Sequence, residues 1–115
     1  MANRALPGYE MPVGVKKEIT LDHDGPASYS NIVVNAGTGD VITAADIGMG
    51  GIETVDVDSL SSDGLNYVWV EYINGGNGNA VPSIRLRWIV LSSNAEVGNT
   101  VNLSSKSIRL RFRGV

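Results

Sequence analysis

NYVWVEYI (residues 66–73) and SIRLRWIVL (residues 83–91) are two apolar runs joined by NGGNGNAVP, residues 74–82. Side chains of an extended chain alternate between two faces, so Ile84, Leu86 and Trp88 share one face of the second run. Both runs are therefore predicted to be strands, and the Gly- and Asn-rich connection predicts an antiparallel hairpin. Both tryptophans lie in this pair. Because aromatic side chains bury the most apolar area, we expect the core here.

The chain has 115 residues and no cysteine, which suits a single domain without a disulfide framework. Fourteen glycines and few helix-favouring runs indicate β structure with many turns. No apolar run approaches the length of about 18 residues that a membrane span needs, and no secretory signal is recognisable. We expect no membrane association and one domain over residues 15–115.

Charge is divided unevenly along the chain. Residues 1–71 contain eleven acidic and three basic side chains, whereas residues 72–115 contain one acidic and six basic ones. The two halves are electrostatic complements. The net charge of −3 argues against a general nucleic-acid binder, so no nucleic-acid partner is expected.

Residues 1–14 (MANRALPGYEMPVG) contain two prolines and two glycines without sustained alternation, which predicts an extended arm. One interpretation is a frayed terminus. The other is that its apolar side chains dock on a neighbouring subunit, because a freely disordered tail is usually more polar. Those side chains are Leu6, Tyr9, Met11 and Val13.

The remaining segments predict further strands and one helical turn. Strands are expected at residues 15–22, 31–35, 41–42, 51–58 and 107–113, with a short edge segment at 101–103. Thr43 and Asp46 have the spacing of a capping box, and Gly48 follows closely, so one short helical turn is expected at residues 43–48. Ile47 and Met49 would be its apolar contacts.

Seven or eight short strands separated by Gly, Asn and Ser turns predict an all-β fold. Within the last run, Ile108, Leu110 and Phe112 alternate with three arginines, the typical pattern of a half-buried strand. We expect an antiparallel β-sandwich with jelly-roll-like topology.

No residue constellation indicates a chemical activity. Asp22, His23 and Asp24 are adjacent, but neighbouring strand residues point to opposite faces and rarely converge on a metal ion. Asp56 and Asp58 share a face, yet two acids on the polar side of a strand are more often solvated or paired with bases than used for glycoside hydrolysis. We therefore expect no catalytic residue, no metal site, no cofactor and no enzymatic activity.

The basic residues of the C-terminal half form the most informative polar set. They are Arg85, Arg87, Lys106, Arg109, Arg111 and Arg113. If the two strands that carry most of them lie in one sheet, an arginine-lined face results. These arginines would then either pair across strands with Asp56, Asp58 and Glu71, or dock on an acidic protein surface, for which the planar guanidinium is well suited.

From residue 41 to residue 114 the order of segments resembles small β-sandwich proteins encoded among the structural genes of tailed bacteriophages. The resemblance is carried by the capping turn at 43–48, by IETVDV and YVWVEY, by IRLRWIVLSSNAEVGNTVNLS and by the final SIRLRFRG. Some members of that group are capsid decoration, or cement, proteins. The resemblance implies a virion structural protein, made in the host cytoplasm, that binds the outer capsid surface and bridges neighbouring copies of the major capsid protein.

For this role we expect the interface in the arm and near the C-terminus, at Leu6, Tyr9, Met11, Val13, Arg109, Arg111 and Arg113. A homo-oligomer, either a dimer or a trimer, is compatible with the sequence, and so is a monomer. The alternative is a carbohydrate- or receptor-binding module of a phage tail or a cell surface. That alternative requires exposed aromatic side chains beside carboxylates, and burial of Tyr67, Trp69, Tyr72 and Trp88 would remove its main support.

Overall fold

The computed structural model describes residues 16–73 and 80–115. The described part contains seven strands and one short 3-10 helix, which confirms the all-β prediction. The strands are β1 (Lys17–Asp24), β2 (Asp40–Thr43), β3 (Ile52–Val57), β4 (Asn66–Ile73), β5 (Ser83–Val90), β6 (Ala95–Glu96) and β7 (Ser107–Gly114), and the helix is η1 (Ala45–Ile47).

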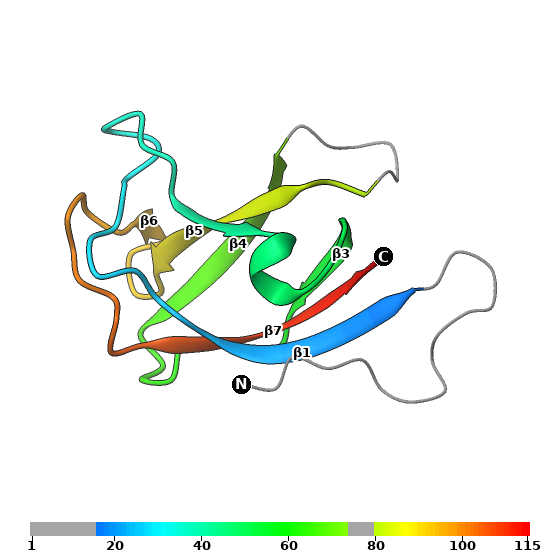
Figure 1. Ribbon diagram of the computed structural model, residues 1–115. Coiled ribbons are helices and arrows are strands. Elements are labelled where there is room, and N and C mark those ends of the chain that lie inside the picture. Colours follow the sequence, from blue (N-terminus) through cyan, green and yellow to red (C-terminus); the bar gives the residue numbers. More distant parts are fainter. Residues whose placement is uncertain (1–15, 74–79) are drawn as a thin grey trace.

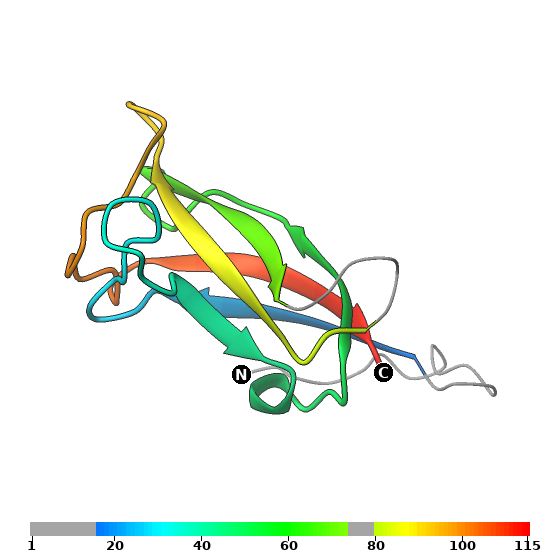
Figure 2. The same ribbon diagram turned by 90° about the horizontal axis from the view of Figure 1, so that it is seen from above.

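The strands form two antiparallel sheets that face each other. One sheet has the order β1-β7-β3 and the other β2-β5-β4, with β6 paired to the end of β5. Figures 1 and 2 show β1 and β7 in one layer and β4 and β5 in the other. Strands β1 to β4 alternate between the sheets, after which β5 and β7 each fill the central place of one sheet. This alternation between the two sheets is jelly-roll-like, as predicted.

The predicted hairpin is the longest ladder of its sheet. Asn66 lies opposite Val90 and Ile73 opposite Ser83, so β4 and β5 pair over their full length. Val81, which precedes β5, forms an isolated antiparallel bridge with Ile52 of β3. The two sheets are therefore joined by backbone hydrogen bonds at this end of the sandwich.

A single hydrophobic core fills the space between the sheets. Its fully buried members from the two central strands are Ile84, Leu86 and Trp88 of β5 and Ile108, Leu110 and Phe112 of β7. These are the inward faces predicted from the alternation of both runs. Each such side chain stabilises the fold by roughly 1.5–3 kcal/mol when it is fully buried.

The aromatic part of the core differs from the expectation. Trp88 is buried, but Trp69 and Tyr72 of β4 are 57% and 41% exposed. The alternation in β4 separates two faces without indicating which one packs inward, and it is Val68 that enters the core. Tyr29, in the loop after β1, is instead the tyrosine that is fully buried in the core. Its hydroxyl donates to the Glu96 carboxylate at 2.8 Å and accepts from the Trp88 N–H at 3.1 Å.

The strand expected from NIVVN is not formed, because side-chain oxygens occupy the backbone donors of this segment. Asn31 Oδ1 accepts from the N–H of Val34 at 2.7 Å. The Glu96 carboxylate accepts from the N–H groups of Ile32 and Val33 at 2.8 and 3.0 Å. Such side-chain bonds compete directly with strand pairing. The segment is a turn, and it presents Val33 and Val34 to solvent.

The helical turn is confirmed in a 3-10 form. The N–H of Thr43 donates to Asp46 Oδ2 at 3.2 Å and the N–H of Asp46 donates to Thr43 Oγ1 at 3.1 Å, a reciprocal capping box. Gly48 ends the turn in the left-handed region, with φ of 76°. Ile47 and Met49 are buried as predicted.

The edge strand expected at residues 101–103 is absent from the described sheets. Leu103 is instead buried in the core, and its N–H donates to the carbonyl of Pro26 at 2.8 Å. The apolar character of this segment therefore reflects core packing of a loop rather than strand pairing.

Candidate functional site

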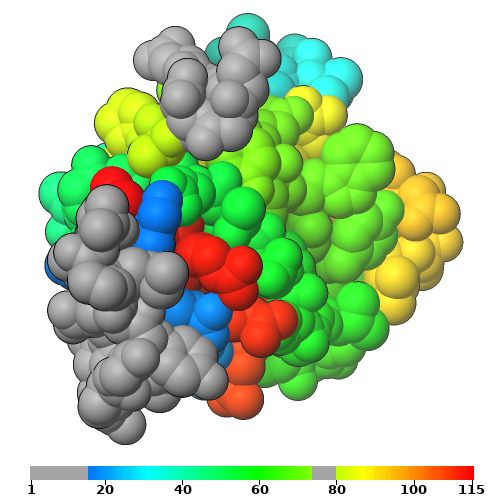
Figure 3. Space-filling model, turned by 90° about the vertical axis from the view of Figure 1, so that its right-hand side faces the viewer, coloured from blue at the N-terminus to red at the C-terminus, as the bar shows by residue number. Residues whose placement is uncertain are grey.

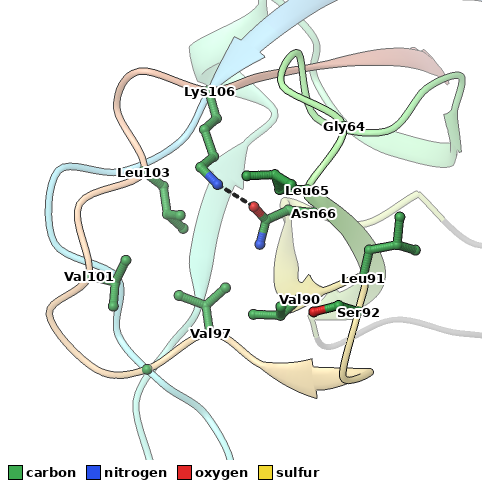
Figure 4. A pocket seen from close by; sticks show the side chains of 11 residues that line it. Gly64, Leu65, Asn66, Val90, Leu91, Ser92, Val97, Val101, Leu103 and Lys106 are labelled. Carbon is green, nitrogen blue, oxygen red and sulfur yellow. Dashed lines mark hydrogen bonds between the residues drawn. The ribbon is translucent and has the colours of Figure 1, made fainter.

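Loops at one end of the sandwich enclose a pocket of about 460 Å³, here called the end pocket. It lies where the segments before β4, after β5 and before β7 meet (Figure 4). Its aliphatic lining consists of Leu65, Val90, Leu91, Val97, Val101 and Leu103. The N–H of Leu91 donates to the carbonyl of Leu65 at 3.0 Å, which fixes two of the three segments to each other. The pocket is thus formed by loops whose backbones are tied together.

One wall of the end pocket is polar. The ammonium group of Lys106 donates to Asn66 Oδ1 and lies 3.0 Å from Asp63 Oδ2, and Figure 4 shows the lysine directed toward the asparagine. Hydrogen bonds from the Ser61 hydroxyl, the Leu65 N–H and Lys106 lower the pKa of Asp63 to about 2. An ammonium group has three N–H donors. The contacts with Asn66 and Asp63 account for two of those of Lys106, which leaves a third for another acceptor.

The turn that replaces the expected strand lies beside this pocket. We call Val33 and Val34, which are 67% and 84% exposed, the valine turn. Asn31 anchors it, because its Nδ2 donates to the carbonyl of Val97, a pocket residue, at 2.7 Å. Burial alone would raise the pKa of Glu96, but hydrogen bonds from two backbone N–H groups and the Tyr29 hydroxyl lower it. A charged carboxylate therefore holds the valine turn in place.

Other exposed apolar side chains lie in the loops at the same end of the sandwich as the end pocket and the valine turn. Six of the eleven exposed large hydrophobic side chains in the described part of the chain lie in loops at this end. These six, here called the apolar end, are Val33, Val34, Leu60, Leu65, Leu91 and Val101. A concentration of exposed apolar side chains in one region is typical of protein–protein contact sites. Sequence reasoning missed this surface because the contributing residues are scattered over four loops.

The three C-terminal arginines that we expected at a partner interface lie in a row along the outer face of β7. Figure 3 shows β7 in red between β1 in blue and β3 in green. Arg109 pairs with Asp22 at 2.8 Å and Arg113 with Glu18 at 2.9 Å, both on β1. On the other side Arg111 lies 3.6 Å from Asp56 of β3 and 3.4 Å from Asp58.

These acidic neighbours compensate the positive charge of the three arginines. The hydrogen bond from Arg109 lowers the pKa of Asp22, and the same contact raises the pKa of the arginine. The outer face of this sheet is therefore a mixed ion-pair surface rather than an uncompensated basic one. Pairing across strands was one of the two interpretations of the sequence, and docking on a partner stays a prediction.

The arginine-lined face that the sequence allowed is not assembled, because its two strands belong to different sheets. Arg85 and Arg87 lie on β5, on the sheet opposite β7. Both pair with Glu71 of β4, at 2.6 and 2.8 Å. Lys106 belongs to the end pocket instead. The predicted pairing with Glu71 is confirmed.

The arm side chains Leu6, Tyr9, Met11 and Val13 lie outside the described residues. Their expected contact with a partner stays a prediction.

The aromatic residues that distinguish the alternative function are divided between core and surface. Trp88 is fully buried, whereas Trp69 stands exposed on the outer face of its sheet. It lies opposite Arg87 in the ladder between β4 and β5. Arg87 in turn forms an ion pair with Glu71, two residues after Trp69 on β4. Tyr72 is partly exposed but its hydroxyl accepts from the N–H of Val55 at 3.1 Å, so it links the two sheets.

The one histidine takes part in a contact that the sequence did not indicate. His23 Nε2 lies 2.7 Å from Asp40 Oδ2, and the indole Nε1 of Trp88 donates to the same oxygen at 3.0 Å. Asp40 is buried. Asp22, next to the histidine, points outward to Arg109. The cluster joins β1, β2 and β5 across the sandwich.

The side chains described around this cluster include no nucleophile in the adjoining cleft. A cleft of about 250 Å³ adjoins His23, and no hydroxyl or thiol occurs among the described side chains that line it. Nucleophilic catalysis needs such a group within hydrogen-bond reach of the base. In residues 16–73 and 80–115, no group of three or more His, Asp or Glu side chains is arranged to hold a metal ion. The contact of His23 with Asp40 connects β1 to β2.

Comparison of the chain with protein-family models, with curated proteins and with solved structures returned no match. None of the helices in the described portion is long and apolar enough to cross a membrane.

Proposed function

We propose that this protein is a capsid decoration protein of a tailed bacteriophage that binds the outer surface of the assembled shell and bridges neighbouring copies of the major capsid protein. The observation that carries the proposal is the apolar end, a set of exposed aliphatic side chains on anchored loops at one end of a jelly-roll sandwich. The resemblance of residues 41–114 to small phage structural proteins supports the same role.

The anchored backbone of the valine turn supports binding to a preformed surface. Val34 is 84% exposed, yet its own N–H is bonded to Asn31 and the preceding N–H to Glu96. Because the backbone is already fixed, burying these valines against a partner costs little ordering entropy. Full burial of an aliphatic side chain is worth roughly 1.5–3 kcal/mol.

Stabilisation of the shell would follow from mass action. A protein that binds the assembled shell but not free capsid subunits shifts the equilibrium toward the assembled state. Contacts of modest affinity suffice when each decoration subunit touches more than one capsid subunit, since the second contact is effectively intramolecular.

Co-sedimentation with purified particles lacking this protein tests the proposal. The wild-type chain should bind at a fixed number of copies per particle. Val34→Asp should weaken binding at least tenfold, because a carboxylate would be buried in an apolar contact. Val41→Asp, on β2 and 41% exposed outside the apolar end, is the matched control and should bind normally. Unchanged occupancy with Val34→Asp would contradict the proposed contact.

A second candidate is a carbohydrate- or receptor-binding module, favoured by Trp69. An exposed indole beside Arg87 and Glu71 offers a stacking surface with hydrogen-bonding groups next to it. Binding to immobilised glycans that is lost in Trp69→Ala and kept in Val34→Asp would favour this candidate over decoration. Retention on particles with no binding to glycans would favour decoration over carbohydrate binding.

A further inference from the structure

The end pocket is preformed, apolar and open, and we propose that it binds the N-terminal arm of a second copy of this chain. Its volume of about 460 Å³ lies within the roughly 300–1,000 Å³ of typical ligand pockets. The described chain starts at Lys16, so fifteen residues of known sequence precede it. Self-association of this kind requires no capsid, and its test is independent of the proposed virion role.

The arm starts at the opposite end of the molecule from the pocket. Lys17 lies opposite Gly114 at the start of β1, and its ammonium group donates to the carbonyl of Gly48. At the other end of β1, the N–H of Gly25 donates to the carbonyl of Lys106, a pocket residue. The eight residues of β1 separate the two ends by roughly 26 Å, at about 3.3 Å per residue.

This separation favours a second copy over the chain's own pocket. Fifteen extended residues span at most about 50 Å. To reach its own pocket, the arm would have to run back along the sandwich and use about eight residues to do so. Only the residues before Gly8 would then reach the pocket, and Leu6 alone of the four apolar arm residues lies there. A neighbouring copy can receive Tyr9, Met11 and Val13 directly.

The chemistry of the arm matches that of the pocket. Tyr9, Met11 and Val13 are spaced by two, so in an extended chain they share one side. Pro7 and Pro12 restrict the backbone, which lowers the entropy lost on docking. An extended segment leaves carbonyl groups unpaired, and the ammonium group of Lys106, a lining residue of the pocket, is a donor that one of them could use.

The proposed contact is heterologous, because an arm meets a pocket and not another arm. Such contacts close when they are exchanged reciprocally in a dimer or passed around a ring. The expected product is therefore a closed oligomer of defined mass.

Mixing two complementary variants tests the inference with the full chain. Leu91→Asp places a carboxylate in the pocket but keeps the arm, whereas the double variant Tyr9→Ser/Met11→Ser keeps the pocket and weakens the arm. Each variant alone should be monomeric, at the 12.2 kDa of one chain, by light scattering at about 100 µM protein. Mixed at equal concentrations, they should form a 1:1 complex of twice that mass, because one arm and one pocket remain compatible.

Three controls make the outcome decisive. The wild-type chain should be oligomeric, and Val34→Asp, at the same end but outside the pocket lining, should stay oligomeric. Val101→Asp replaces Leu91→Asp if the latter does not fold, since Val101 is also an exposed pocket residue. A monomeric wild-type chain, or variants that fail to combine on mixing, would overturn the inference.

Discussion

Replacing Glu96 by glutamine tests the interaction that holds the valine turn. The carboxylate accepts three hydrogen bonds, at 2.8 Å from the Tyr29 hydroxyl, 2.8 Å from the Ile32 N–H and 3.0 Å from the Val33 N–H. Glutamine has nearly the same shape but one acceptor oxygen. Its amide nitrogen would face the N–H of Val33. Both groups are donors, so no hydrogen bond could form between them.

The magnitude follows from the bonds that are lost or weakened. Hydrogen bonds to a charged group contribute about 1.5–3 kcal/mol and neutral ones about 0.5–1.5 kcal/mol. Two bonds would weaken by about 1 kcal/mol each, and the third would be lost, partly replaced by water because Val33 is exposed. We expect a loss of about 2–3 kcal/mol in the free energy of unfolding. For a chain of this size that lowers the melting temperature by about 8–12 °C.

The pH dependence gives an independent check. The pKa of Glu96 is lowered in the folded state, so its stabilising effect is complete above the ordinary glutamate pKa of about 4.3 and is lost as the pH falls through the folded-state pKa. The stability gap between wild type and Glu96→Gln should be constant from pH 7 to about pH 5 and then shrink. Hydrogen exchange at Ile32 and Val33 should accelerate in the variant.

Thermal unfolding monitored by circular dichroism supplies the assay, with Glu53→Gln as the control. Glu53 forms an ion pair with the partly exposed Lys16, and a pair of this kind is worth at most about 1 kcal/mol. A gap within error at pH 7, or one that persists unchanged at pH 3, would refute the assignment of Glu96 as the charged anchor of the turn.

Three further predictions concern stability, each measured by the same unfolding assay. Asp40→Ala should cost about 2–4 kcal/mol, because it leaves the buried indole N–H of Trp88 without its acceptor, and an unchanged melting temperature would contradict this role. Gly114→Ala should destabilise at least as much, since its Cβ would lie 2.0 Å from the carbonyl oxygen of Gly51 and backbone cannot move aside; folding as stable as wild type would show that the strands can separate. Arg109→Ala should leave the melting temperature unchanged within error because its ion pair is exposed, and a clear drop would assign that pair a larger role.

The strands that carry the core could be predicted from the sequence because burial imposes strict alternation. In β7, Ile108, Leu110 and Phe112 meet the other sheet while the intervening arginines face solvent. The capping box could also be predicted, since Thr43 and Asp46 interact within one turn of the chain. Such local patterns are set by neighbouring residues alone.

Features that depend on distant partners could not be predicted. NIVVN has the composition of a strand, but the Glu96 carboxylate, 64 residues beyond Ile32, accepts from two of its backbone N–H groups and turns this backbone away from a sheet. The outward direction of Trp69 depends on which face of β4 packs inward, a choice that alternation leaves open. The end pocket is assembled from loops that no spacing in the sequence connects.

In the valine turn, the groups that fix the fold are different from the side chains that are exposed to solvent. Its conformation depends on the backbone N–H groups of residues 32–34 and on two anchoring side chains, Asn31 and Glu96. The side chains of Val33 and Val34 take no part in that anchoring. Other residues could occupy these two positions without a folding penalty, so natural variation or laboratory selection can change the binding preference here while the sandwich stays the same.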